Sequence, residues 1–281
     1  MVNDVIFNTQ KNTNDFVEQI KSYSNYIRTN CSIRKIRLSA TTIYLMCGTE
    51  KGKNLFLISN PYSASSFADI LYSSIYNKKQ TINDITILDK NWMMPLEGIS
   101  TEKLKHTISI MNNQLKKACC KEKLRSIFMI GFGYDIIDNK IFITPHFHGI
   151  TFKNKGISKE FRESFAGGFF NASSVHIREI TATEKYTKEQ KLLGWIQYMC
   201  FQFPIKYSQR EKDRKVSYPL KQDKNFVKVM QLLGSIPFTK ITVAIGRQEK
   251  QILHELNLFL QDGINAGQEF IQKYKLRAIK M

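Results

Sequence analysis

The segment that most constrains the fold is residues 125–152, RSIFMIGFGYDIIDNKIFITPHFHGITF. Two runs rich in β-branched and aromatic residues flank Asp138 and Asn139, which both tolerate turn geometry. Runs of this kind on either side of a short turn predict a two-stranded antiparallel hairpin. We therefore expect the hairpin to belong to a β-sheet whose apolar face is covered by other elements of the chain.

The second strand of this hairpin carries His146, Phe147 and His148. Successive side chains of a strand point to opposite faces, so the two histidines project from one face, about 7 Å apart along the chain, while Phe147 faces the core. A two-residue turn would place Gly131 opposite His146 and Met129 opposite His148, and the glycine would leave room above the sheet. Two imidazoles on one face can ligate one metal ion. The alternative is a pair of histidines held by ordinary hydrogen bonds.

Helices and strands alternate around the hairpin. Ser100, a good N-cap, precedes apolar residues at helical spacing and predicts a helix over residues 100–120. A short helix is expected at residues 158–165, a strand at 174–180 and an amphipathic helix at 187–203 that Pro204 ends. This order indicates an α+β fold, in which helices pack on an antiparallel sheet.

The remaining segments add elements at both ends. Residues 206–224 are charged and poor in apolar side chains, which favours a linker or an exposed basic loop. We divide the chain into an N-terminal segment (1–53), a core (54–204, clearest from residue 100) and a C-terminal α/β segment with its basic linker (205–281), which is either an appended domain or a cover for the sheet. The other expected elements are helices at 13–27, 66–76, 225–233 and 248–275, and strands at 33–46, 54–59, 85–88 and 239–244.

The charge predicts a polyanionic partner. The 281 residues include 42 Lys and Arg against 24 Asp and Glu, a formal net charge of +18. Nucleic acid is the polyanion that such a balance favours, and a basic surface kept only for solubility is the alternative. The sequence has no apolar run of membrane-spanning length and no signal-peptide pattern, which predicts a cytoplasmic protein with no membrane partner. Five cysteines without a CxxC pair favour reduced thiols.

The helix expected at residues 187–203 carries three further candidates. Tyr198 and Gln202 are four residues apart, hence on one face, and Trp195 lies on the same side. Trp195 could pack the helix or stack on a base. An ordinary amphipathic helix edge would show the same spacing.

Together, TPHFHGITF and the Tyr198 helix resemble the HUH endonucleases, which cut single-stranded DNA with a tyrosine. The resemblance covers residues 100–203 in element order and spacing, and residues 54–59 are a candidate for the family's upstream strand. It implies that His146, His148 and Gln202 hold Mg²⁺ or Mn²⁺ and that Tyr198 forms a 5′-phosphotyrosine intermediate. Phe201 occupies the place of the lysine in the Tyr-x-x-Lys pattern of replication initiators, and the spacing of Tyr198 and Gln202 is similar to that of the single-tyrosine transposases.

Length favours a rolling-circle replication initiator of a plasmid, phage or other mobile element, acting at a single-stranded or hairpin origin site. A single-tyrosine transposase or a relaxase remains an alternative. A third reading is a non-catalytic DNA-binding protein that uses the basic tail. Either way, the side chains expected to contact DNA are Trp195, Lys206, Arg210, Arg214 and Lys215.

Three enzyme classes are excluded by their missing signatures. A histidine-triad hydrolase would have a third histidine at Ile150. Zinc deaminases and HExxH proteases would show their own motifs, and a dinucleotide enzyme needs a third glycine after Gly131 and Gly133.

Overall fold

The computed structural model describes residues 68, 70–75, 80–152, 156–167, 173–200, 206–211, 214–219 and 238–261, with a few residues between 225 and 236. The chain divides into two compact units. One comprises Phe67–Cys200 and Thr239–Asn257, and the other comprises Met1–Ser66, Phe201–Phe238 and Leu258–Met281. The elements expected at residues 13–27, 33–46 and 54–59, and Gln202, lie outside the described residues.

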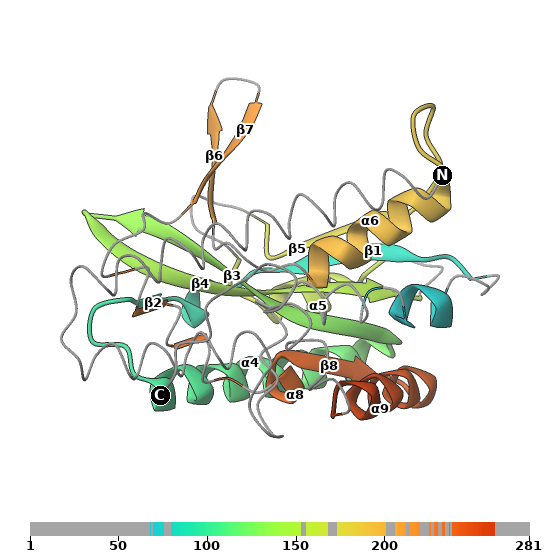
Figure 1. Cartoon of the computed structure of the whole chain (residues 1–281), viewed down its shortest axis with the longest axis horizontal. Helices are drawn as coiled ribbons and strands as arrows, with labels where there is room; N and C mark the ends of the chain where they lie inside the picture. The colour runs from blue at the N-terminus through green and yellow to red at the C-terminus, as the bar shows by residue number, and fades with distance from the viewer. Residues whose placement is uncertain are drawn as a thin grey trace, which may run out of the picture. The chain divides into compact units, whose positions relative to one another are not determined.

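The first unit is built on one antiparallel sheet (Figure 1). The strand order is β5-β1-β4-β3-β8, and the short β2 pairs with β4. The α+β class expected from the sequence is therefore confirmed, and β4, which carries both histidines, lies inside the sheet between β1 and β3. The strands are β1 (Asn83–Ile87), β2 (Met94–Pro95), β3 (Ser126–Ile137), β4 (Lys140–Thr151), β5 (Val175–Glu179) and β8 (Thr242–Ile245).

The β3–β4 hairpin has the predicted turn. Asp138 and Asn139 have φ angles of 49° and 60°, and positive φ at both central residues is the requirement of the two-residue turn that matches strand twist. The turn fixes the register along the whole hairpin, so that Gly131 pairs with His146 and Met129 pairs with His148. Both pairings agree with the sequence expectation.

Helix α4 (Thr101–Glu122) covers the face of the sheet opposite the histidines. Ser100 caps it by accepting a hydrogen bond from the Lys103 amide, as predicted. Trp92, in the 3-10 helix η1 (Lys90–Trp92), links α4 to the sheet. Its ring lies edge-on to Phe147 at 5.4 Å between centroids, and its Nε1 donates to Gln114 Oε1 at 3.0 Å. Phe147 is fully buried, which confirms that it faces the core.

The other helices and strands expected in this unit are also present within the described residues, and the expected helix ends at residues 201–203 and 262–275 lie outside them. Residues 68 and 70–75 are helical, as are the described residues 225, 228, 229, 232 and 233 of the other unit. Ser158 caps the short helix by accepting from the Phe161 amide. The helices are α5 (Lys159–Glu163), α6 (Lys188–Cys200), α8 (Phe238–Ile241) and α9 (Arg247–Gln261).

The strand expected at residues 239–244 is wrong at its start. Residues 239–241 belong to α8, and β8 begins at Thr242. The β8 ladder with β3 runs only from Thr242 opposite Met129 to Ile245 opposite Ser126, so Thr242 is the first residue with a ladder partner. The preceding turn is held instead by Asn112 of α4, whose Nδ2 donates to the Lys240 carbonyl.

The charged stretch after Pro204 is a hairpin rather than a linker or loop. Strands β6 (Lys206–Glu211) and β7 (Arg214–Pro219) form a two-stranded antiparallel sheet in the second unit. Arg210 pairs with Lys215 and Lys206 pairs with Pro219. Ladder formation uses backbone groups and does not require apolar side chains, so a low apolar content misled the sequence reading. Within the part of the chain that the structure describes, no helix has the length and apolarity needed to cross a membrane.

Candidate metal and tyrosine site

The two histidines of β4 turn the same ring atom toward each other. The Nε2 atoms of His146 and His148 lie 2.8 Å apart, and the ring planes are perpendicular with centroids at 4.5 Å. The predicted convergence on one face is thus present. His148 is buried, with 4% of its surface exposed.

The opposite ring nitrogens are held by oxygen atoms. His146 Nδ1 lies 2.9 Å from the Thr144 carbonyl oxygen, which can only accept, so Nδ1 carries the proton and, in the neutral ring, Nε2 has the lone pair. His148 Nδ1 lies 3.1 Å from the Thr86 hydroxyl oxygen. Because a hydroxyl can donate or accept, it suits either ring tautomer of His148. When it accepts, both Nε2 atoms present lone pairs.

This donor set fits a divalent ion. Two nitrogens on adjacent positions of an octahedral ion, at bonds of roughly 2.1 Å, lie about 3 Å apart. The observed 2.8 Å is close to that separation. Oxygen partners on the far nitrogens are also the usual support of histidine ligands. Within the described ranges, no three His, Cys, Asp or Glu side chains group to hold a metal, and the third expected ligand, Gln202, lies outside these ranges.

Thr86 is a site residue that the sequence reading missed. It lies on β1 directly opposite His148, and the same residue faces His176 on β5. A strand was expected at residues 85–88, but the pairing of β1 with β4 joins residues 62 positions apart. No local pattern carries that information.

Helix α6 covers His148 with two aromatic rings. The His148 ring lies 5.5 Å from Trp195 and 4.8 Å from Tyr198, centroid to centroid. Trp195 and Tyr198 lie 5.3 Å apart at an interplanar angle of 31°. The spacing that put Trp195 and Tyr198 on one helix face therefore brings both to the histidine pair.

A hydrogen bond joins the Trp195 side chain to the sheet. Its Nε1 donates to the Gly149 carbonyl at 2.9 Å, one residue beyond His148. A side chain on Gly149 would collide with the Phe128 ring, so the glycine makes room for Phe128 on the other face of the sheet. Of the two roles foreseen for Trp195, packing of the helix is the one present, and stacking on a base stays a prediction.

Tyr198 is both reachable and perturbed. Its side chain is among the exposed large hydrophobic groups, with 51% of the residue accessible. Partial burial nevertheless raises the pKa of the Tyr198 phenol above its ordinary value, because the charged form loses hydration. A phenol with a raised pKa holds its proton at neutral pH and needs help to act as a nucleophile.

The sheet places two further polar side chains, one of them the cationic Arg178, on the histidine face. His176 is opposite Thr86 on β5, and Arg178, two residues on, is exposed. Arg178 donates from Nε and Nη2 to Asp84 Oδ2, at 3.0 and 2.8 Å. Both were seen in the sequence only as members of a strand.

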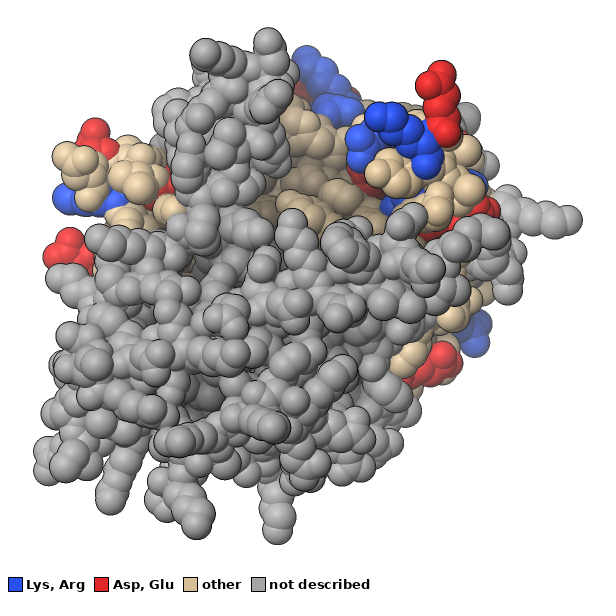
Figure 2. All heavy atoms as spheres, turned by 45° about the horizontal axis from the view of Figure 1, so that its top comes forward, with Lys and Arg blue, Asp and Glu red and all other residues tan. Residues whose placement is uncertain are grey.

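The expected DNA-contacting residues outside α6 belong to the other unit. Lys206 and Arg210 lie on β6, and Arg214 and Lys215 lie on β7. Among the coloured atoms of the space-filling view, basic and acidic side chains lie near one another (Figure 2). A comparison with models of protein families, with curated proteins and with solved structures finds no match for this chain.

Proposed function

We propose that the chain is a metal-dependent endonuclease and strand transferase that cuts single-stranded DNA through Tyr198. The observation that carries the proposal is the histidine pair, with Nε2 atoms 2.8 Å apart, beneath the Tyr198 ring. Two lone-pair nitrogens this close repel unless a cation lies between them or one carries a proton. An exposed tyrosine and a bound cation are together the groups that a phosphodiester-cleaving site requires.

His146 and His148 would hold the ion, with Gln202 as the proposed third ligand. Held by these residues, Mg²⁺ or Mn²⁺ would supply Lewis-acid stabilisation of the negative charge that develops on the scissile phosphate. Imidazole ligands are less usual for Mg²⁺, which prefers oxygen, and this favours Mn²⁺ in the test tube. Thr144 and Thr86 would act through the histidines: the Thr144 carbonyl holds the proton on His146 Nδ1, and the Thr86 hydroxyl, when it accepts from His148 Nδ1, leaves His148 Nε2 as the nitrogen that faces the ion.

Tyr198 is the proposed nucleophile. Its phenol oxygen attacks phosphorus, the bond from phosphorus to the 3′ oxygen breaks, and the DNA 5′ phosphate remains on the tyrosine. The phenol releases its proton to solvent, and the departing 3′ oxygen takes up a proton to become a hydroxyl. The phosphodiester energy is kept in the phosphotyrosine, so the strand can be rejoined by the reverse attack without ATP.

Arg178, an exposed cation on the histidine face, suits a contact with the DNA strand. Asp84 holds the Arg178 guanidinium in place, on the same face as His148 and Thr86. Phosphate contacts from such a residue would position the strand without reading its bases. We assign the same role to Lys206, Arg210, Arg214 and Lys215 of the β6–β7 hairpin.

Among the enzymes of this mechanism we favour a rolling-circle replication initiator of a plasmid, phage or other mobile element. With 281 residues, the chain has segments in addition to the proposed catalytic unit, among them the β6–β7 hairpin, and we assign to these segments the recognition of an origin. A transposase or relaxase would use the same site.

The test is incubation of the full chain with single-stranded oligonucleotides and Mn²⁺ or Mg²⁺. We expect cleaved product and a covalent protein–DNA species, both lost with EDTA and reduced by orders of magnitude in His146→Ala and His148→Ala. His176→Ala, a histidine on the same face outside the pair, is the matched control and should retain most cleavage. Undiminished cleavage in the double variant of the pair would reject this site, and DNA binding without metal-dependent cleavage would favour the non-catalytic reading.

A further inference from the structure

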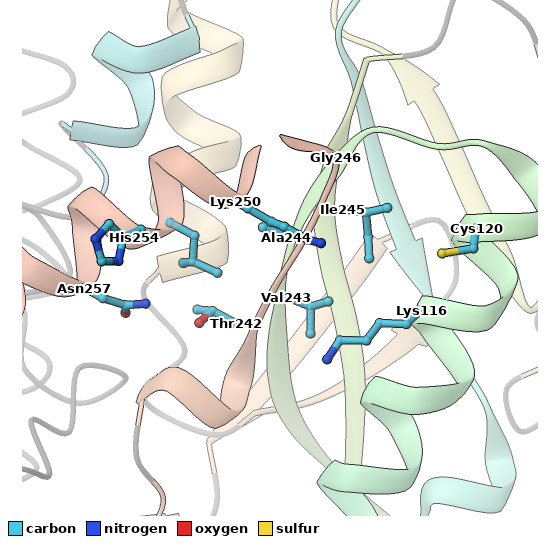
Figure 3. A pocket seen from close by; sticks show the side chains of 11 residues that line it. Lys116, Cys120, Thr242, Val243, Ala244, Ile245, Gly246, Lys250, His254 and Asn257 are labelled. Atoms are coloured by element: carbon cyan, nitrogen blue, oxygen red, sulfur yellow. The ribbon is translucent and has the colours of Figure 1, made fainter. Parts of the chain in front are cut away.

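A hollow beside β8 is separate from the histidine pair. It has a volume of about 520 Å³ and runs along the strand between α4 and α9, which flank β8 from its two sides (Figure 3). Helix α4 contributes Lys116 and Cys120, and α9 contributes Lys250 and His254. The volume falls in the range of small-molecule sites.

The polar groups around this hollow are cationic or neutral. Lys116 and Lys250 extend toward β8 from the two helices (Figure 3). Among the described residues that line it there is no Asp or Glu. Neither lysine forms an ion pair within the described residues. Two unpaired ammonium groups that approach one space from different elements favour an anion with several oxygens.

Two further features indicate that the anion is part of a larger molecule. Val243, Ala244 and Leu253 are apolar residues among those that line the hollow. Asn257 also lines it, and within the described residues the buried Asn257 Oδ1 has no hydrogen-bond partner. A buried acceptor without a donor carries a desolvation cost that a ligand N–H or O–H would remove.

We propose that this hollow binds a nucleotide, with its phosphate between Lys116 and Lys250. A nucleotide offers phosphate oxygens to the two lysines and a flat base to the apolar lining residues such as Val243. It also offers N–H or O–H donors to Asn257 Oδ1. The nucleotide can come from a free mononucleotide or from a strand of nucleic acid, and both carry the same recognised chemistry. This site does not depend on the cleavage reaction proposed for Tyr198.

Cys120 provides a local reporter for the site. Its thiol is exposed and lies in the lining, whereas the neighbouring Cys119 is buried and burial raises its pKa to about 12. A thiol with so high a pKa reacts slowly with alkylating reagents, because the thiolate is the nucleophile. Alkylation of the peptide that contains both cysteines therefore reports on Cys120, and a Cys120→Ser variant verifies the assignment.

The experiment measures the affinity of the full chain for ATP and for a single-stranded oligonucleotide by calorimetry, together with the protection of Cys120 from N-ethylmaleimide. The test variant is Lys116→Ala/Lys250→Ala. The control is Lys117→Ala/Lys240→Ala, which removes the same charge from exposed positions outside the hollow. Loss of two charge-assisted contacts should weaken binding about tenfold or more in the test variant and little in the control.

The outcomes separate the two sources. Protection of Cys120 by ATP, with ATP affinity lost only in the test variant, identifies a site for free nucleotides. If only the oligonucleotide protects Cys120, and only its affinity is lost in the test variant, the bound nucleotide is part of a strand. If neither ligand protects Cys120, or if the two double variants bind both ligands equally, the proposal is overturned. Because the readouts are binding and thiol protection, inactivity of the Tyr198 site would not affect them.

Discussion

The Trp195 indole donates its Nε1 hydrogen to the Gly149 carbonyl at 2.9 Å, and this bond ties α6 to the strand that carries the histidines. Gly149 follows His148 directly, and Tyr198 is one helical turn beyond Trp195. The bond therefore sets the position of the Tyr198 ring above His148. Trp92 makes a comparable bond on the opposite face, to Gln114 Oε1 at 3.0 Å.

We expect Trp195→Phe to lower both stability and the rate of covalent attachment to DNA. Phenylalanine keeps most of the ring packing but loses the hydrogen bond, which should reduce the free energy of unfolding by about 1 kcal/mol. A displaced nucleophile should slow attachment by between about tenfold and a hundredfold. Trp92→Phe is the matched control, with a similar loss of stability in denaturant titrations and little loss of rate. Equal rates for the two variants would show that Trp195 does not position Tyr198.

Thr86→Val should weaken metal binding while keeping the shape of the side chain. Valine removes the hydroxyl beside His148 Nδ1 and leaves β1 and its pairing in place. Removal of such a partner typically costs about tenfold to a hundredfold in metal affinity. Titration with Mn²⁺ followed by electron paramagnetic resonance measures this directly, and Thr86→Ser should restore the affinity. If the valine and serine variants bind Mn²⁺ equally well, the hydroxyl has no role in orienting His148.

Covalent attachment should be faster at higher pH. Burial raises the pKa of Tyr198, so the phenol is protonated at neutral pH and its reactive anion grows as the pH rises toward that pKa. Replacement of Tyr198 by 3-fluorotyrosine, whose phenol is more acidic, should move the rising limb of the rate profile to lower pH. The measurement is the rate of adduct formation against pH for both proteins at saturating metal. Superimposable profiles would mean that ionisation of Tyr198 does not control the rate.

The parts of the site that are local in sequence could be predicted. Asp138 and Asn139 adopt the turn that their residue types favour, and because the turn fixes the register, the pairings of His146 and His148 followed from it. The helical spacing of Trp195 and Tyr198 likewise placed both on one face. Each of these inferences depends on fewer than about twenty consecutive residues and on geometry that side-chain type controls.

The parts that depend on pairing between distant segments could not be predicted. Thr86 reaches His148 because β1 pairs with β4, and Asp84 reaches Arg178 because β1 also pairs with β5. The β6–β7 hairpin was missed because its strands lack an apolar alternation. The start of β8 was placed too early because the β-branched residues before Thr242 suit a strand, although β3 offers them no ladder partner.

The most direct test of the central claim is the identity of the residue that becomes attached to DNA. Wild-type protein incubated with a single-stranded oligonucleotide and Mn²⁺ should yield a covalent species that tryptic digestion and mass spectrometry map to Tyr198 through a 5′ phosphate. Tyr198→Phe should form no such species and should bind the oligonucleotide nearly as well as the wild type, because one oxygen and no charge is removed. An adduct that persists in Tyr198→Phe, or that maps to Tyr186 or Tyr207, would contradict the assignment of the nucleophile.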